Sequence, residues 1–506
     1  MPRLLLSLLV LALPAFAQDA APAPSAPDAA AVRPPVLSEA LAQLAVDPIF
    51  TTATVGVEVV NAETGERVYS NGGDTALIPA STMKLVTAAV ALRELGPSWR
   101  YPTWVLADAA PGGDGVLNGN LYIKGQGDPT MVIERMWRMV LDLKLRGVTE
   151  IRGDVVFDDG YFKDSTTIPG WPSKEDLQDG PTYFAPLGAL SVNYNVAAIN
   201  VRPGASVGAP AVASLEVPNT SALLENHLVT GSSKSRYWAR LDRKLDEATG
   251  KVATFTLTGN VPVDQPPDVF YRALSDPLTN YIAAFQMVAA QQGLKVKGSF
   301  RPGAAPGGAK LVLKSESDPL SEILAQMNKL SNNFMAEQVL RTVGAEKYGL
   351  PGTTDKGVRA VNAYLESLGA PAGSYKITNG SGLTRATNIA PAVMDRVLVD
   401  MYRNPEFSAE FVQSLSVGGR DGTLRHRFRD DGMEGRVRGK SGTLDGVRCL
   451  AGYVDATDGN TYAFSFLVNN IPGATARAKA AHDRLVLTLS GTTGDVADGS
   501  DEDAGD

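Results

Sequence analysis

A short stretch of the chain places a serine and a lysine at the start of an apolar helix. Ser81-Thr82-Met83-Lys84 is continued by the apolar residues 85–92, and Gly96-Pro97 supplies the usual signals for a helix end. Residues three apart in a helix project from the same face. The hydroxyl of Ser81 and the amine of Lys84 are therefore expected to lie side by side.

This pairing has a chemical interpretation and a structural one. A serine attacks a carbonyl at neutral pH only when a base removes its proton, and a partly buried lysine with a lowered pKa can be that base. The positive end of the helix dipole also favours developing alkoxide character on Ser81. However, Ser-x-x-Lys is frequent by chance, and a helix cap beside a surface lysine explains it without chemistry. The choice depends on partner motifs elsewhere in the chain.

The length and composition are those of an ordinary soluble protein. The 506 residues suffice for about two to four domains, and 44% of them are apolar while 20% are charged. The net charge of −8 argues against a nucleic-acid partner or an anionic surface. The single cysteine, Cys449, excludes an intrachain disulfide and is expected to be a small core residue.

The two ends of the sequence differ in composition from the rest. Residues 1–17 combine Arg3, an apolar run and the cleavage pattern Ala15-Phe16-Ala17, which is typical of a secretory signal peptide. Residues 18–35 are rich in Ala and Pro and predict a linker, whereas residues 491–506 predict a disordered acidic tail. No apolar run approaches about 18 residues. These features predict export to the periplasm, with no integral membrane segment in the mature chain.

Residues 101–314 differ in pattern from the segments on either side. Gly and Pro punctuate short strand-like runs there, and helices are expected at 132–145 and 277–292. This pattern indicates one or two β-rich modules. Before it, residues 54–70 predict a β-hairpin, and after it the helical pattern returns at residue 320.

A second motif, Ser331-Asn332-Asn333, stands between two predicted helices. The first helix is expected at 320–327, and the second begins at Phe334. Because Ser and Asn are preferred N-cap residues, helix capping is a sufficient explanation for this motif when it is taken alone.

A third motif, Lys440-Ser441-Gly442-Thr443, lies in a strand predicted at 437–444. A tight turn leads from it into strands at 447–454 and 461–468, which predicts an antiparallel meander. A cation on such a strand can attract an anionic substrate, and a backbone N–H at its edge can stabilise an oxyanion. Taken alone, a surface lysine on an edge strand explains the motif equally well.

The three motifs agree in order and in local structure, which makes a chance origin much less plausible. Together they resemble the motifs of penicillin-binding proteins and serine β-lactamases. About 245 residues separate Lys84 from Ser331, far more than a compact β-lactamase-like domain needs. We therefore interpret residues 101–314 as inserted β-rich domains, two in number, within a catalytic domain formed by residues 36–100 and 315–490.

This arrangement resembles the class C low-molecular-mass penicillin-binding proteins, the D-alanyl-D-alanine carboxypeptidase/endopeptidase family. The resemblance extends from residue 36 to residue 489 and includes the stretches 127–130, 169–172, 379–385 and 419–425. Two departures are mild, because Asn379 stands where the family often has Asp, and Ser441 stands where it often has Thr.

The resemblance implies a fold, an activity and partners. The fold is α/β (α+β), a β-lactamase/transpeptidase-like domain with an antiparallel sheet flanked by helices and β-rich domains inserted between the first two motifs. The activity is that of a serine-type D-Ala-D-Ala carboxypeptidase or D,D-endopeptidase, with no cofactor and no metal. The partners are peptidoglycan stem peptides ending in D-Ala-D-Ala, cross-linked muropeptides and β-lactam antibiotics.

It also implies roles for the first two motifs. Ser81 attacks the substrate carbonyl to form an acyl-enzyme, with Lys84 as the base, although the base in such sites is disputed. Ser331 relays a proton toward the leaving amine, and Asn333 holds the substrate amide.

The third motif and its surroundings have implied binding roles. Lys440 attracts the substrate carboxylate, the hydroxyls of Ser441 and Thr443 bind it, and Gly442 lies between them. The backbone N–H groups of Ser81 and Thr443 form the oxyanion hole.

Three further candidates are less specific. Arg385 is a candidate for binding a substrate carboxylate. Relatives hold the free amino end of the stem peptide with an acidic residue shortly after a Gly-Trp segment. Glu175 and Asp176 both follow Trp171 at nearly the right distance, so they remain alternatives, and both can instead be exposed loop acids.

Other enzyme classes fit the sequence less well. A serine β-lactamase shares the three motifs, but no Glu-x-x-Leu-Asn that would support fast deacylation lies between the first two. The three histidines are not near a nucleophile elbow, and the zinc-peptidase motif His-Glu-x-x-His does not occur. A β-lactamase and a catalytically inert peptidoglycan-binding relative remain the alternatives.

Overall fold

A six-stranded sheet is built from strands at both ends of the chain. In the computed structural model, which describes residues 39, 41–42, 52–164, 166–167, 180–218, 222–246, 251–429, 432–471 and 475–491, the strand order is β19-β20-β21-β22-β1-β2. The strands are β19 (Ser416–Val417), β20 (Val437–Leu444), β21 (Val447–Asp455), β22 (Thr461–Asn469), β1 (Thr54–Asn61) and β2 (Arg67–Asn71). All neighbours pair antiparallel. The predicted hairpin and the predicted meander are thus confirmed and joined edge to edge.

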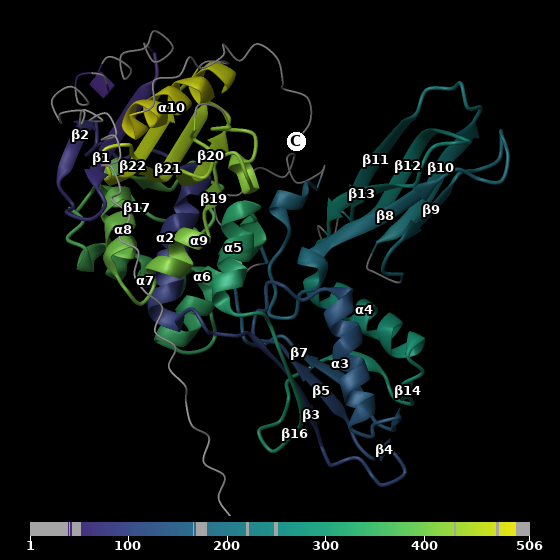
Figure 1. The fold of residues 1–506 in the computed structure, drawn as a ribbon. Coiled ribbons are helices and arrows are strands. Elements are labelled where there is room, and N and C mark those ends of the chain that lie inside the picture. The colour runs from purple at the N-terminus through teal and green to yellow at the C-terminus, as the bar shows by residue number, and fades with distance from the viewer. Residues whose placement is uncertain are drawn as a thin grey trace, which may run out of the picture.

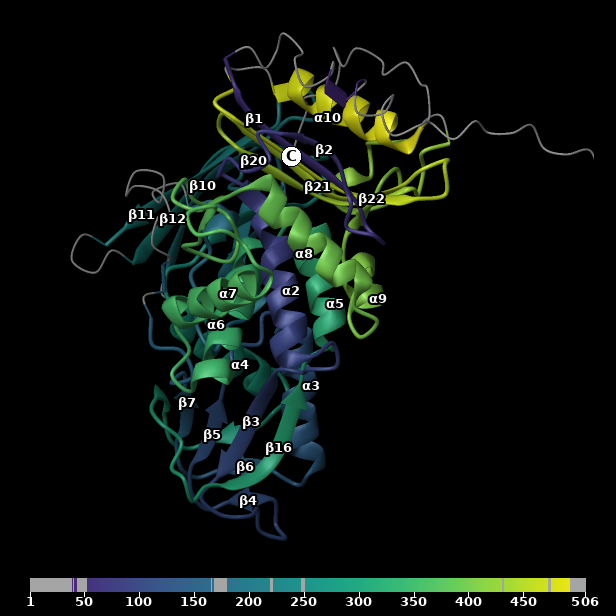
Figure 2. The same ribbon diagram turned by 90° about the vertical axis from the view of Figure 1, so that its left-hand side faces the viewer.

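Helices cover both faces of this sheet, as Figures 1 and 2 show. Side chains of β21 alternate between the faces, so that Leu450 packs with Leu485 of α10 while Cys449 packs in the core around α2. Cys449 is therefore a core residue, as predicted. The helices are α2 (Met83–Leu95), α5 (Leu320–Lys329), α6 (Asn333–Tyr348), α7 (Thr354–Ser367), α8 (Pro391–Arg403), α9 (Ser408–Gln413) and α10 (Thr475–Ser490), and a short two-stranded sheet joins β17 (Tyr375–Lys376) to β18 (Asn388–Ile389).

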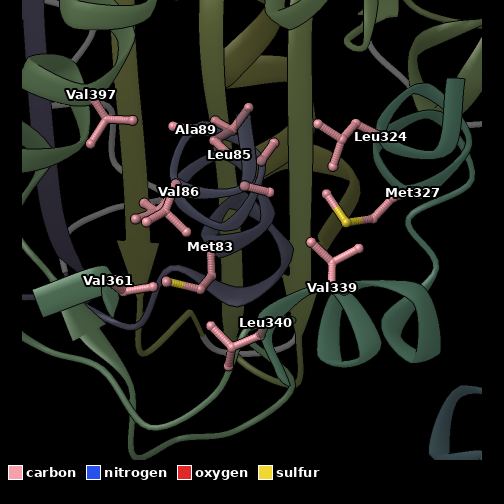
Figure 3. Packing of buried hydrophobic residues seen from close by; sticks show 14 of the residues in the cluster. Met83, Leu85, Val86, Ala89, Leu324, Met327, Val339, Leu340, Val361 and Val397 are labelled. Atoms are coloured by element: carbon pink, nitrogen blue, oxygen red, sulfur yellow. The ribbon is translucent and has the colours of Figure 1, made fainter. Parts of the chain in front are cut away.

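Helix α2 occupies the centre of the main hydrophobic core. Every residue from 83 to 92 is buried, as expected for a helix that is apolar on all sides. Figure 3 shows its side chains surrounded by Leu324, Leu340 and Val397 of three other helices. Gly96 ends the helix with a φ of +81°, which a glycine adopts without strain.

The segment between α2 and α5 forms sheets that are separate from the six-stranded one. A mixed sheet of order β15-β7-β5-β3-β16 packs against α3 and α4, with a small sheet β14-β6-β4 beside it. β5 and β7 run parallel, so the chain must cross over between them, and α3 lies in that crossover. These elements are β3 (Pro102–Ala107), β4 (Val116–Leu117), β5 (Leu121–Lys124), α3 (Ile133–Leu145), β6 (Glu150–Ile151), β7 (Val155–Asp158), α4 (Pro277–Gln291), β14 (Lys295–Val296), β15 (Phe300–Pro302) and β16 (Lys310–Glu316).

A second group of strands lies above this mixed sheet in the view of Figure 1. Two three-stranded sheets, β10-β12-β11 and β13-β8-β9, enclose a common core that includes Ile199 and Phe255. We call this pair of sheets the strand module. Its strands are β8 (Val196–Arg202), β9 (Val212–Leu215), β10 (Leu223–Gly231), β11 (Trp238–Leu245), β12 (Val252–Pro262) and β13 (Asp268–Ala273).

The architecture agrees with the predicted fold class, an antiparallel sheet flanked by helices within an α+β protein. On this connectivity we propose that residues 101–314 are an insertion into the domain that carries the three motifs. The predicted signal peptide and linker lie outside the described residues, as does the predicted tail except for Gly491. Among the described residues, no helix is both long and apolar enough to cross a membrane.

The central position of α2 predicts that two leucines differ in their contribution to the free energy of unfolding. Leu85 is fully buried, whereas Leu145 at the end of α3 is 70% exposed. Leu85→Ala is expected to lower the free energy of unfolding by about 2–5 kcal/mol, because it leaves a cavity in the main core. Leu145→Ala is the control and should change it little. Urea unfolding followed by far-ultraviolet circular dichroism measures both, and equal midpoints for the two variants would contradict the packing described here.

Candidate active site

Ser81 lies in a strained turn directly before α2. The turn η2 (Ala80–Thr82) is a 3-10 helix, and Ala80 adopts a left-handed φ of +45°. Gly382 packs against this turn so closely that a Cβ at its position would lie 1.8 Å from the carbonyl oxygen of Ala80. Such strain persists only where the surrounding structure holds it, and it is often found at functional sites. The nucleophile candidate is therefore held rigidly at the end of the central helix.

Lys84 is completely buried, and its three ammonium protons have three acceptors. Its Nζ lies 3.0 Å from Oγ of Ser81, 2.7 Å from Oδ1 of Asn333 and 2.9 Å from the carbonyl oxygen of Ser381. Burial lowers the pKa of Lys84 well below its usual value, and the nearby charge of Lys440 lowers it further. A neutral amine at this position can accept the proton of the Ser81 hydroxyl.

The second motif caps a helix and also contributes to the site. Asn332 is the N-cap of α6, because its Oδ1 accepts a hydrogen bond from the backbone N–H of Met335 at 3.0 Å. Its two neighbours point elsewhere: Oγ of Ser331 accepts from Nζ of Lys440 at 2.8 Å, and Oδ1 of Asn333 accepts from Lys84. Capping thus explains only the middle residue, and the structure brings the outer two together with both lysines.

The third motif supplies a second buried lysine. Lys440 on β20 is fully buried and donates to Oγ of Ser331 and, at 2.9 Å, to the carbonyl oxygen of Ser441. Burial lowers the pKa of Lys440 to about 7. The Ser441 hydroxyl donates to Oγ1 of Thr423 at 2.8 Å, which links β20 to the stretch 419–425. Lys440 can therefore be a cation near neutral pH that is able to meet an anionic group.

Gly442 lets β20 lie against the turn that carries Ser81. A Cβ at position 442 would lie 2.7 Å from the carbonyl oxygen of Pro79 and 3.1 Å from the backbone nitrogen of Ser81. This close approach brings the backbone of β20 next to the backbone N–H of Ser81. Two backbone donors from separate elements, at Ser81 and Thr443, can then face one carbonyl oxygen, as an oxyanion hole requires.

Glu337 is a residue of the site that motif analysis missed. Its fully buried carboxylate accepts hydrogen bonds from the backbone N–H groups of Gly380, at 3.0 Å, and Ser381, at 2.8 Å. Burial raises its pKa. These bonds hold the loop whose Ser381 carbonyl accepts from Lys84. A sequence signal was present, because Glu337 is four residues after Asn333 and thus on the same face of the predicted helix.

The remaining candidates lie at the margin of this cluster or outside the described residues. The Arg385 side chain is 60% exposed and donates to the carbonyl oxygen of Asp445 at 2.7 Å, in the turn after β20. The structure therefore places it near the C-terminal end of β20, beyond Lys440. Glu175 and Asp176 lie outside the described residues.

Comparison with known proteins finds a family of D-Ala-D-Ala carboxypeptidases and individual relatives of the same kind. The model of the D-Ala-D-Ala carboxypeptidase 3 (S13) family matches residues 37–490. A D-alanyl-D-alanine carboxypeptidase of Actinomadura sp. is 33% identical over 489 residues, which cover 94% of this chain and 88% of that protein. The D-alanyl-D-alanine carboxypeptidase DacB of Haemophilus influenzae is 25% identical over 448 residues, with coverage of 86% and 89%.

Solved structures show the same fold. Penicillin binding protein 4 (dacB) from Haemophilus influenzae superposes with a TM-score of 0.74 at 23% identity, over 90% of this chain and 98% of that one. A structure of the same protein complexed with a β-lactam has a TM-score of 0.70 at 23% identity, over 90% and 99%.

The contact at Gly442 predicts a sensitive position. In Gly442→Ala the added methyl group must push β20 away from the Ser81 turn, which moves the two backbone donors apart. We expect acylation by a fluorescent penicillin to slow by about 100-fold or more, the cost of losing one oxyanion donor. Gly307→Ala is the control, because no atom lies within 4 Å of its added Cβ. An unchanged acylation rate in folded Gly442→Ala would refute this placement of the oxyanion hole.

The two lysines predict a bell-shaped pH dependence of kcat/KM. Activity should rise with pH as Lys84 loses its proton and should fall as Lys440, whose pKa is about 7, loses the charge that attracts a substrate carboxylate. Arginine keeps its charge throughout this range. Lys440→Arg should therefore lose the alkaline fall, even at a lower absolute rate. An alkaline fall that persists at the same pH in Lys440→Arg would exclude Lys440 as its origin.

Proposed function

The chain belongs to the D-Ala-D-Ala carboxypeptidase 3 (S13) family and is a D-Ala-D-Ala carboxypeptidase, and we propose that it works through an acyl-enzyme on Ser81. The observation that carries this assignment is the hydrogen bond of 3.0 Å between Ser81 and the fully buried Lys84. A nucleophile and base at this distance, with the base oriented by other groups, is the arrangement that serine acyl transfer requires.

In the acylation step, neutral Lys84 accepts the proton of Ser81 while Oγ attacks the carbonyl carbon of the penultimate D-Ala. The carbonyl oxygen becomes negatively charged and faces the backbone N–H groups of Ser81 and Thr443. Each such donor typically contributes about 2.7–4 kcal/mol to transition-state stabilisation. Because Ser381 and Asn333 also accept from Lys84, its amine stays aimed at Ser81.

The leaving amine needs a proton, and Ser331 is the group placed to deliver it. Its hydroxyl is bonded to Lys440 at 2.8 Å, so a proton given to the amine can be replaced from that lysine. A water molecule then attacks the acyl carbonyl and gives up a proton to Lys440 through Ser331, while Lys84 returns its proton to Oγ of Ser81 as the bond to the acyl carbon breaks. The same donors stabilise the second oxyanion, because the geometry at the carbonyl carbon is the same.

Substrate binding uses the two walls of the site. On one wall, Nδ2 of Asn333 can donate to a substrate carbonyl while Oδ1 stays bonded to Lys84, because the bond of Nδ2 to the carbonyl oxygen of Tyr183 is long at 3.3 Å. On the other wall, the charge of Lys440 and the hydroxyls of Ser441 and Thr443 suit a terminal carboxylate. Arg385, at the far end of β20, and Glu175 or Asp176 are proposed to contact the stem peptide beyond these groups.

We further propose the biological setting of this reaction. The substrates are peptidoglycan stem peptides ending in D-Ala-D-Ala and cross-linked muropeptides, so that the enzyme acts as both carboxypeptidase and D,D-endopeptidase. β-Lactam antibiotics acylate the same serine. The signal-like residues 1–17 support export to the periplasm.

One experiment tests the nucleophile. The mature protein is incubated with a fluorescent penicillin, and the label is located by peptide mapping; we expect it on Ser81. In Ser81→Ala labelling should vanish while the thermal unfolding midpoint stays close to that of the wild type, because Ser81 is not part of the hydrophobic core. Labelling that survives in Ser81→Ala would refute the assignment, and label lost within seconds from the wild type would favour a β-lactamase.

A further inference from the structure

Most of the lining of a cleft beside the catalytic cluster is not used by the mechanism described so far. It has a volume of about 430 Å³ and lies between the second motif and the strand module. Ser331 and Phe334 line one wall, while Tyr194, Glu216 and Tyr271 line the other. Clefts of this size typically hold a ligand far larger than a single amino acid.

The wall formed by the strand module is an ordered row of side chains. Tyr271 on β13 is paired with Ala198 on β8, and the backbone N–H of Glu216 donates to the carbonyl oxygen of Ala198 at 2.9 Å. Tyr271 and Glu216, which directly follows β9, therefore lie on either side of Ala198, and all three residues line the cleft. Tyr271 is 54% exposed, which leaves much of its ring available for contact.

The turn that brings Tyr194 to the wall of the cleft is strained. Asn193, Tyr194 and Asn195 have consecutive left-handed φ values of +48°, +55° and +56°, a conformation that costs about 1–2 kcal/mol for each residue with a side chain. Buried Asn195 holds the turn by donating to the carbonyl oxygen of Pro186 at 2.8 Å. The turn places Tyr194 edge-on to Phe334, with ring centroids 6.2 Å apart, and lets Nδ2 of Asn193 donate to Glu216 at 3.3 Å. Maintained strain of this kind points to a function.

The position of the cleft identifies which part of a substrate reaches it. Ser331 lines the cleft and is bonded to Lys440, whereas the other end of β20 leads to Asp445 and Arg385. Lys440 and Asp445 are five residues apart, which is about 17 Å along an extended strand. Under the proposed mechanism the leaving amine departs at Ser331. A group attached to that amine therefore enters the cleft, whereas the acyl-donor stem lies toward Arg385.

We propose that this cleft is the binding site for the leaving peptide of a cross-link, the stem that carries the amine released from the acyl-enzyme. This proposal rests on the proposed function. A single D-Ala leaving group fills only a small part of a cleft of about 430 Å³, so cross-linked substrates are expected to gain most from it. Glu216 is the one charged side chain among the described residues that line it, and it favours the N–H donors of peptide amides over a second carboxylate. The tyrosine rings pack on the aliphatic parts of the leaving residue.

The test compares two substrates across matched variants. Glu216→Ala and Tyr271→Ala remove the two exposed wall residues. The control for Glu216→Ala is Glu225→Ala on β10, which removes the same residue type. The control for Tyr271→Ala is Trp238→Ala on β11, which removes an aromatic side chain of similar exposure. Both control residues belong to the strand module but lie outside the cleft. For a cross-linked muropeptide dimer, we expect kcat/KM to fall by about five- to tenfold in each cleft variant, mainly through KM. For an uncross-linked pentapeptide, kcat/KM and the rate of penicillin acylation should stay within about twofold of wild type.

The outcomes separate this proposal from the proposed function. Equal losses on dimer and pentapeptide, or a larger loss on the pentapeptide, would assign the cleft to the acyl donor and overturn the proposal. Unchanged cleavage of both substrates in both variants would also overturn it. Failure of the wild type to form an adduct on Ser81 would instead contradict the proposed function itself.

Discussion

The site depends on the burial of two lysines close to each other. Each ammonium group taken out of water costs several kcal/mol unless hydrogen bonds replace its hydration, and two like charges add repulsion. Lys84 meets this requirement with acceptors from its own turn, from α6 and from the loop at Ser381, while Lys440 uses Ser331 and its own strand. The positions of four separate segments are thereby fixed. The same burial lowers both pKa values, that of Lys440 to about 7 and that of Lys84 well below its usual value.

The backbone is strained at two residues that help to supply the hydrogen-bond acceptors of the buried lysines. Ala80 and Ser331, each next to or within a motif, have left-handed φ values of +45° and +55° although neither is a glycine. The turn at Ala80 aims the hydroxyl of the neighbouring Ser81 at Lys84, and Ser331 aims its own hydroxyl at Lys440. Such conformations survive only because the packing around them supplies more stabilisation than the strain removes. The buried residues 83–92 of α2 and the close approach of Gly382 provide that support at Ala80.

The sequence predicted the parts of this structure that depend on local chemistry. The three motifs, the end of α2 at Gly96 and the meander around Lys440 follow from spacing, turn residues and apolar pattern. The structure brings together Ser81, Lys84, Ser331, Asn333 and Lys440, whose catalytic roles stay predictions. The contacts of Glu337 with Gly380 and Ser381 could not be predicted, because they join segments 43 and 44 residues apart through tertiary packing. The cleft at Glu216 and Tyr271 was missed for the same reason. The residues of its walls come from segments that are far apart in the sequence, so no local sequence pattern connects them.

Helix α6 explains how a large insertion can serve the chemistry without disturbing it. The proposed insertion leaves and re-enters the catalytic domain at adjacent points, since Tyr101 and Ser317 exchange hydrogen bonds of 2.8 and 3.0 Å. An insertion with neighbouring ends strains its host little. Farther along, Gln338 of α6, which directly follows Glu337, donates to the carbonyl oxygen of Gly188 at 2.8 Å. One helix thus carries the second motif, supports the Ser381 loop and anchors the inserted segment. Any part of a substrate that touches the strand module is consequently positioned relative to Asn333 and Lys84, so binding energy gained in the cleft can be used at the scissile bond.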